Sequence, residues 1–217
     1  MDAGKIRLIT LGSALAAVIG VEILARTLAA ADLFSSLTVT LLARLAQIGL
    51  ILALVELFQD GPAEVGLAPH AARPGIAAGL RWSLVFGGVV AIVGTVLLAA
   101  GISPVSFFRL HLFGGAKTMA VYFVTGTVVA PFAEELFFRG LLYGFFRRWG
   151  VVLAVILTTV VFALLHLAAL TLPVTQVIGG IIFCLAYEKE KNLWTPYLIH
   201  ALGNAAIFLL GLVPAGM

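Results

Sequence analysis

Long apolar runs separated by short polar breaks dominate this chain. They predict seven membrane-spanning helices, at residues 6–30, 34–58, 76–100, 119–146, 151–172, 174–187 and 194–213. Several of the runs approach or exceed the roughly 20 residues that a helix needs to cross the hydrocarbon core of a bilayer. Alternating ten-residue segments, which are typical of a membrane barrel, are absent from the sequence. The pattern therefore predicts an all-α polytopic membrane protein, a bundle of about seven transmembrane helices.

Polar breaks divide the chain. Residues 59–74 combine prolines with charged side chains and predict a loop. Residues 101–117 are also broken by proline and glycine, but their Phe and Leu side chains favour a position along the membrane interface. The sixth span is short and follows Pro173, which favours a tilted, re-entrant or shielded helix. We expect N-terminal transmembrane helices and this interfacial loop over 1–118, a helical core over 119–213, and a short tail over 214–217.

Composition supports a membrane protein. The chain is 62% hydrophobic and 11% charged, with a mean hydropathy of +1.17, whereas a soluble domain carries roughly 25% charged residues. The net charge of +3 does not indicate a nucleic-acid partner, because Arg and Lys lie mostly at span ends and no basic patch interleaved with aromatic side chains occurs. The single cysteine, Cys184, excludes an intramolecular disulfide and a cysteine-based metal cluster.

Basic residues predict the orientation. Lys5 and Arg7 lie at the start of the first span, and a cytoplasmic N-terminus places most other basic residues on the same side. The first run superficially resembles a signal peptide, but it exceeds the usual apolar length of about 7–15 residues and contains Glu22 and Arg26 one turn apart. We expect an uncleaved span there. Short loops and an Ala-, Gly- and Leu-rich composition favour a prokaryotic inner (cytoplasmic) membrane.

Several polar residues outside the predicted core need an interpretation. We expect Glu22 to pair with Arg26, and the deeper Arg44 to find Glu22 or a backbone carbonyl as its partner. A structural role is the first interpretation of these residues, and substrate recognition is the alternative. The run of alternating charges at 188–191 predicts a solvated loop.

Three polar groups lie deep inside predicted spans. Glu134 lies on the fourth span, His166 on the fifth, and His200 on the seventh. Counted from the cytoplasmic boundary at ~1.5 Å per residue, their depths are roughly 20, 22 and 13 Å. Ionisable groups at such depth usually face the bundle interior or a wet cavity and mark function. The sequence therefore predicts one shared site in the middle of the membrane.

The spacing on the fourth span predicts separate roles for its two glutamates. Consecutive helical residues project about 100° apart, so Glu134 and Glu135 cannot both face one point. Glu135 and Arg139 are spaced to form an ion pair on one face, which we interpret as structural support. Glu134 remains as the free carboxylate and the candidate general base for water. Pro131 predicts a kink that opens room for water.

The histidines complete the predicted chemistry. His166 follows Phe162 by one turn and shares its face, where it can orient the same water or bind a metal. His200 and Asn204 share a face of the last span, and both can donate hydrogen bonds to a developing oxyanion.

Other hydrolytic sites are excluded or disfavoured by their missing motifs. Neither H-E-x-x-H nor G-x-S-x-G occurs, and the aspartates all lie outside the deep spans. Glu134, His166 and His200 can supply three ligands to a zinc ion with one position open. No two of these three residues are spaced i,i+4 on one helix, and Asn204 is a poor zinc ligand. We therefore favour a site without a cofactor, with zinc as the alternative.

The three groups resemble a known family. Residues 131–141, PFAEELFFRGL, resemble the first motif of the CPBP family (CAAX proteases and bacteriocin-processing enzymes), two glutamates followed by three residues and an arginine. Phe162 to His166 resembles the second motif and His200 to Asn204 the third, and the resemblance covers roughly 119–213. It implies a CPBP-like core and a glutamate-dependent intramembrane endopeptidase reached from the cytoplasm. In that scheme Glu134 and His166 activate water, while His200 and Asn204 stabilise the oxyanion.

The expected partners are the lipid bilayer and a membrane-associated or lipidated protein or peptide substrate. Some relatives cleave prenylated CAAX proteins and others process peptide precursors, so the resemblance leaves the substrate open. A proton-coupled transporter would also place carboxylates and histidines at mid-depth, but it would more often show repeated halves. A non-catalytic membrane scaffold or chaperone would have no chemical need for all three motifs.

Overall fold

Every regular element in the described part of the chain is helical. The computed structural model describes residues 6–103, 115–167 and 173–212. Its helices are α1 (Leu8–Ala30), α2 (Ser36–Phe58), α3 (Ala72–Ala99), α4 (Ala116–Val124), α5 (Ala130–Glu135), α6 (Gly144–Phe146), α7 (Val151–Leu165), α8 (Val174–Glu190) and α9 (Trp194–Gly211). Wider π turns, Thr125–Val129 and Leu136–Tyr143, join α4, α5 and α6 into one segment that ends in a 3₁₀ turn, Arg147–Trp149. The predicted all-α bundle is confirmed.

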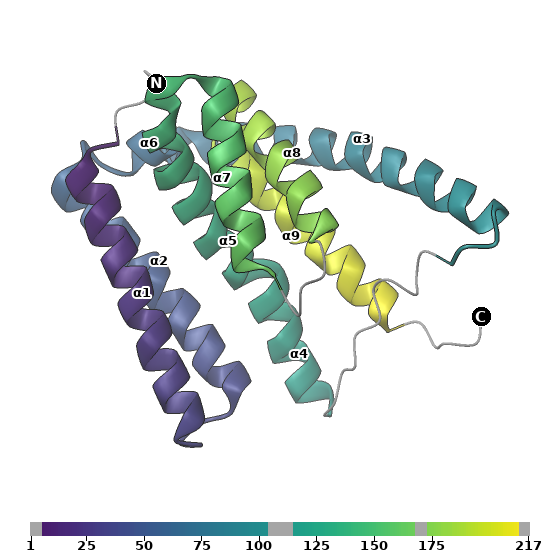
Figure 1. Cartoon of the computed structure of the whole chain (residues 1–217), viewed down its shortest axis with the longest axis horizontal. Helices are drawn as coiled ribbons and strands as arrows, with labels where there is room; N and C mark the ends of the chain where they lie inside the picture. Colours follow the sequence, from purple (N-terminus) through teal and green to yellow (C-terminus); the bar gives the residue numbers. More distant parts are fainter. Residues whose placement is uncertain (1–5, 104–114, 168–172, 213–217) are drawn as a thin grey trace.

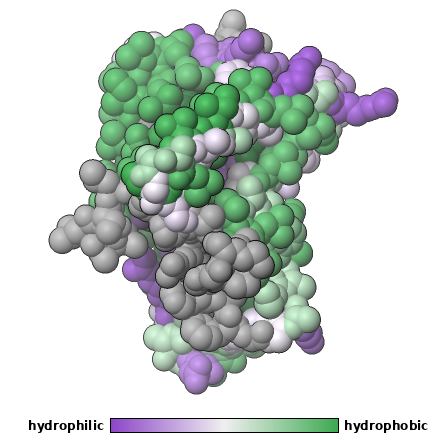
Figure 2. All heavy atoms as spheres, turned by 90° about the vertical axis from the view of Figure 1, so that its right-hand side faces the viewer, coloured by the Kyte–Doolittle hydropathy of each residue, from purple (hydrophilic) through white to green (hydrophobic). Residues whose placement is uncertain are grey.

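Among the described residues, four helical segments are long and apolar enough to cross a membrane, namely Leu8–Ala30, Ser36–Phe58, Pro62–Ala99 and Ala116–Trp149. Val151–Leu165 is a shorter apolar helix, because α7 ends at Leu165, with His166 as its cap, rather than running to the predicted residue 172. Apolar side chains cover much of the face seen in Figure 2. The chain is therefore an integral membrane protein, as predicted. Most of the predicted interfacial segment, residues 104–114, lies outside the described residues.

The helices form a central group with one hairpin beside it (Figure 1). α1 and α2 make an antiparallel pair, and α2 packs against α5. α7, α8 and α9 surround the other side of α5 and its π turns. α3 packs on α9 near its start, where Gly75, Ala78 and Gly79 are buried, and then diverges from the bundle. The main core lies between α2, the segment 136–145, α7 and α8, at the same end as the N-terminus.

The loop that follows α2 packs against the turn between α8 and α9. Two 3₁₀ turns, Pro62–Val65 and Pro69–Ala71, shape this loop. Gly66 adopts a φ of +83°, and a Cβ at this position would lie 2.8 Å from the backbone nitrogen of Leu193. That nitrogen donates a hydrogen bond of 3.0 Å to the carbonyl of Gly66. The close approach therefore requires glycine.

Glu22 pairs with a different arginine from the one expected. Its Oε1 accepts hydrogen bonds from Nη1 of Arg44 at 2.6 Å and from Nε2 of Gln47 at 2.9 Å. The predicted partner of Arg44 is thus confirmed. The predicted Glu22–Arg26 pair is wrong for the described residues, because Glu22 turns toward α2 and Arg26 is exposed.

The charged run 188–191 is not a solvated loop. α8 continues to Glu190, and Glu188 accepts hydrogen bonds from Tyr143 at 2.7 Å and from two nitrogens of Arg147 at 3.0 Å each. Nζ of Lys191 lies 2.7 Å from Oε1 of Glu188. Burial raises the pKa of Glu188, but the hydrogen bonds from Arg147, Lys191 and Tyr143 outweigh burial and lower this pKa to about 2. The run therefore ties α8 to the end of the central segment.

Candidate active site

Pro131 determines the backbone on which the site is built. Ahead of it, the Ala130 N–H bonds to the carbonyl of Thr125, five residues back. In this register the Gly126 carbonyl would accept from residue 131, but proline has no N–H. Nδ2 of Asn204 donates to the Gly126 carbonyl at 2.9 Å instead. Pro131 thus lies near the start of α5, just after a widened π turn, a feature that is frequent at functional sites. The kink expected at Pro131 stays a prediction.

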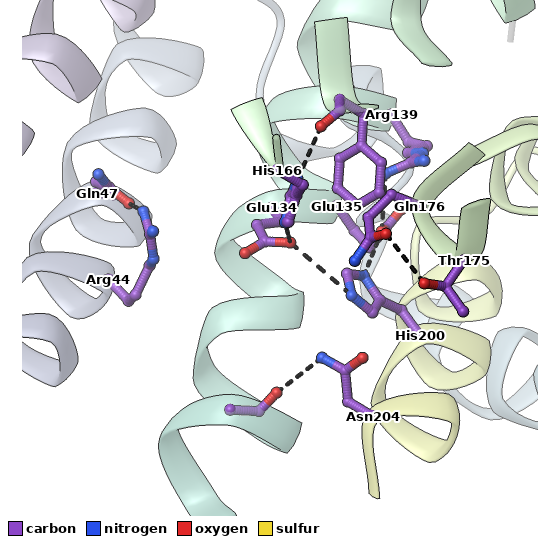
Figure 3. A network of polar contacts seen from close by, with 12 residues as sticks. Arg44, Gln47, Glu134, Glu135, Arg139, His166, Thr175, Gln176, His200 and Asn204 are labelled. Carbon is purple, nitrogen blue, oxygen red and sulfur yellow. Dashed lines mark hydrogen bonds and ion pairs between the residues drawn. The ribbon is translucent and has the colours of Figure 1, made fainter. Parts of the chain in front are cut away.

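Glu134 faces two imidazoles from two other helices. Its Oε2 lies 3.9 Å from Nε2 of His166, at the end of α7, and 3.8 Å from Nε2 of His200 on α9. Figure 3 shows the Glu134 carboxylate directed toward both rings. The Glu134 side chain is 18% exposed and that of His166 is 31% exposed. The groups predicted to share one site therefore do lie together, and the side chains of Glu134 and His166 are partly exposed.

Glu135 carries a second contact beside the expected ion pair. Its Oε1 accepts from Nη1 of Arg139 at 2.9 Å and lies 2.7 Å from Nδ1 of His200. The Glu135 and Arg139 side chains are fully buried. The i,i+4 spacing predicted the Arg139 contact, whereas the His200 contact joins helices far apart in sequence and no local pattern indicates it. Oε2 of Glu135 and Nε of Arg139 are buried without a hydrogen-bond partner among the described residues.

Aromatic rings enclose the Arg139 guanidinium. Its Cζ lies 4.8 Å from the centre of the Phe162 ring and 5.0 Å from that of Phe183, within the range of cation–π attraction. Nη2 also donates to the carbonyl of Gly180 at 3.3 Å. Arg139 is therefore compensated by Glu135 and held by α7 and α8. Phe183, which the sequence did not indicate as part of the site, also stacks on the His200 ring with centroids 4.8 Å apart.

Hydrogen bonds at the two Nδ1 atoms select the imidazole tautomers. Nδ1 of His166 lies 2.7 Å from the carbonyl of Phe162, which only accepts hydrogen bonds. Nδ1 of His200 faces the Glu135 carboxylate, which is also an acceptor when ionised. Both Nδ1 atoms therefore carry the proton, and in the neutral rings both Nε2 atoms present a lone pair toward Glu134. This arrangement can hold a water molecule and move its protons.

Glu134, His166 and His200 are also the candidate ligands of a zinc ion. Ligand atoms on a tetrahedral zinc lie about 3.3 Å apart, given zinc–ligand distances of about 2.0–2.1 Å. The Glu134–His166 and Glu134–His200 separations of 3.9 and 3.8 Å are wider. No group of three His, Cys, Asp or Glu side chains within the described ranges is arranged to hold a metal ion. The donor types suit zinc, but their spacing in this conformation does not.

Comparisons with known proteins agree with the three motifs. Residues 116–206 match the family model described as Rce1-like, type II CAAX prenyl endopeptidase Rce1-like. The match covers the central helical segment, α7, α8 and most of α9, and it includes Glu134, His166, His200 and Asn204. The predicted resemblance to the CPBP family is thereby confirmed for this part of the chain.

One curated relative is the "Putative membrane peptidase YdiL" of Bacillus subtilis (strain 168), which is 23% identical over 99 residues. The aligned region is 45% of this chain and 40% of that relative, so the chain spans less than half of the length of the protein it matches. No solved structure matches the chain.

Proposed function

We propose that this chain, whose residues 116–206 form an Rce1-like domain, is an intramembrane endopeptidase. It hydrolyses a peptide bond of a membrane-associated or lipidated protein or peptide. The observation that carries the proposal is the position of the Glu134 carboxylate, 3.8 and 3.9 Å from imidazole nitrogens on two other helices. A separation of this size suits two groups that share one water molecule.

Glu134 is the general base in this proposal. The attacking water is held between Oε2 of Glu134 and Nε2 of His166, and Glu134 takes one of its protons as the oxygen bonds to the carbonyl carbon. The Glu134 proton then passes to the leaving nitrogen as the carbon–nitrogen bond breaks. The second water proton passes from the new carboxyl group to the amine, so the products are a carboxylate and an ammonium, and Glu134 returns to its ionised form.

His200 and Asn204 stabilise the oxyanion. In the imidazolium form His200 directs an Nε2–H toward the centre of the site, while its Nδ1–H is held by the Glu135 carboxylate. Asn204 uses one amide N–H on the Gly126 carbonyl and retains a second for the substrate oxygen. Glu135, Arg139 and Phe162 act by holding these groups in place.

The proposed reaction needs no cofactor, and zinc on Glu134, His166 and His200 is the alternative. A non-catalytic membrane scaffold or chaperone is the other function compatible with the fold. We place the protein in a prokaryotic inner membrane with a cytoplasmic N-terminus. Most basic residues lie near helix ends on the same side of the bundle as Arg147 and Arg148. This excess of positive charge supports a cytoplasmic position for that side and for the N-terminus.

Cleavage of a peptide mixture tests the proposal. Purified full-length protein in detergent is incubated with lipidated and transmembrane peptides, and products are identified by mass spectrometry. Glu134→Gln should abolish cleavage, whereas Glu56→Gln, an exposed glutamate on α2, should not. Activity that survives a chelator supports the metal-free reaction, and loss with recovery on zinc supports the alternative. Cleavage by Glu134→Gln at the wild-type rate would reject Glu134 as the base.

A further inference from the structure

A second polar cluster lies at the same depth as the candidate active site. Glu22 is 14 residues from the start of α1, and Arg44 is 14 residues from the end of α2. Glu134 is 15 residues from Trp149, where its helical segment ends. These three helix ends lie together, because Arg7 bonds to the Phe58 carbonyl and Arg148 to the Ile6 carbonyl. At ~1.5 Å per residue all three side chains lie roughly 20 Å from that end.

The cluster joins α1 to α2, the helix that also contacts the segment carrying Glu134. Gln47 is buried and shares a face of α2 with Ile51 and Val55, which belong to the main core. α2 also contacts α5 and the preceding π turn. Figure 3 shows Arg44 and Gln47 on α2 across from Glu134 on α5.

The hydrogen bonds of Arg44 leave one edge of its guanidinium open. Nη1 donates to Glu22 at 2.6 Å and to Gln47 at 2.7 Å. No contact within the described residues engages Nη2 or Nε, and the Arg44 side chain is 26% exposed. These two nitrogens form the fork that binds both oxygens of a carboxylate. A charged group that is part-exposed at mid-membrane depth favours a wet cavity rather than lipid beside it.

We propose that the Nη2–Nε edge of Arg44 is a carboxylate-binding subsite that positions substrate beside Glu134. The ligand is a carboxylate of the peptide, either its free C-terminus or an acidic side chain. Glu22 and Gln47 fix the guanidinium orientation, so that binding a carboxylate requires little further ordering. The inference rests on the proposed peptidase function for the role of the site, but carboxylate binding itself does not require cleavage.

Peptide binding tests the subsite directly. Three fluorescein-labelled, N-terminally acylated decapeptides of alanine and leucine are compared by fluorescence anisotropy with full-length protein in detergent. The first ends in a free carboxylate, the second in an amide, and the third in an amide with one internal glutamate. Glu134→Gln protein is used throughout, so that the probes stay intact. The free-carboxylate or glutamate probe should bind at least about tenfold more tightly than the plain amide probe.

Variants assign that preference to Arg44. Arg44→Lys retains the charge beside Glu22 but loses the fork, and it should reduce the preference to less than about threefold. Arg26→Gln is the matched control, because Arg26 is exposed on α1 one turn from Glu22, and it should leave the preference unchanged. The double variant Glu22→Gln/Arg44→Gln removes both charges together, so that neither is left without its partner. Thermal unfolding of each variant shows whether the protein is still folded.

The outcomes separate this inference from the proposed function. Equal binding of all three probes, or a preference that persists in Arg44→Lys and in the double variant, overturns the subsite. A preference that depends on Arg44 supports the subsite even if the wild-type protein cleaves no peptide, which would count against the peptidase alone. Cleavage that depends on Glu134 without any preference for carboxylate would retain the peptidase and reject the subsite.

Discussion

Nδ1 of His200 lies 2.7 Å from Oε1 of Glu135, the same oxygen that accepts a hydrogen bond from Arg139. This contact gives Glu135 a part in the chemistry that its ion pair alone does not require. The carboxylate accepts the Nδ1–H of His200 and so holds that ring with Nε2 directed toward Glu134. Glu135 is therefore a positioning residue for His200.

Glu135→Gln should lower kcat by about 100-fold or more with little change in KM, because an amide can turn its NH₂ group toward Nδ1 of His200 and no longer holds that ring as the carboxylate does. Steady-state assays at pH 7 measure kcat and KM separately. The control is Glu190→Gln at the end of α8. A kcat close to that of the wild type would argue that Glu135 serves packing alone.

Asn204→Ala should remove an oxyanion donor and lower kcat by about 10²–10³-fold. It should also destabilise the fold by roughly 1–3 kcal/mol, because the Gly126 carbonyl loses its partner. The double variant Pro131→Ala/Asn204→Ala restores a backbone N–H for that carbonyl. Thermal unfolding should therefore recover in the double variant while kcat stays low. Recovery of kcat together with stability would show that Asn204 acts only on the backbone.

Arg139→Met should destabilise the protein by about 3–5 kcal/mol, because it leaves the buried Glu135 carboxylate without its cation. Glu135→Gln/Arg139→Met removes both charges and should be less destabilised than Arg139→Met alone. Denaturation in mixed micelles compares the variants. The single and double variants would be equally unstable if Arg139 contributed only its packing with Phe162 and Phe183.

Glu188→Gln should lower the melting temperature at pH 7, because it weakens the contacts with Arg147, Lys191 and Tyr143. The lowered pKa of Glu188, about 2, means that the ionised carboxylate stabilises the fold fully above its unfolded value of 4.5. That stabilisation is lost as the pH falls from 4.5 through about 2. The difference in melting temperature between wild type and variant should therefore narrow over this range. A difference that stays constant from pH 7 to pH 3 would contradict the role of the charge.

Apolar run length predicted most of the fold. The expected helix at 34–58 is observed at Ser36–Phe58, and the one at 194–213 ends at Gly211. Depth counting also placed Glu134, His166 and His200 at one level, because each helix rises by a nearly constant distance per residue. Local spacing predicted the Glu135–Arg139 pair, because residues four apart lie on one face of a helix.

Local spacing along the sequence did not predict the contacts between helices. The Glu22–Arg26 prediction considered only neighbours on one helix, whereas Arg44 on the adjacent helix provides the stronger partner. The Glu135–His200 contact likewise depends on how α9 packs beside α5. The prediction of a solvated loop at 188–191 is wrong because Arg147, which is distant in sequence, binds Glu188 in the folded chain.

The π turn Leu136–Tyr143 has a consequence for the variation that this protein can tolerate. A π turn contains one residue more than the α-helical turn it replaces, so it absorbs that residue while the α-helical turns on both sides keep their relative orientation. Removing one residue from an ordinary α-helix instead rotates its two sides relative to each other by about 100°. Loss of one residue from the π turn should therefore restore ordinary winding and keep Glu134 aligned with the helical end that Arg147 anchors to α8. We expect a single deletion within these eight residues to disturb the position of Glu134 less than a single deletion within α7 disturbs the position of His166.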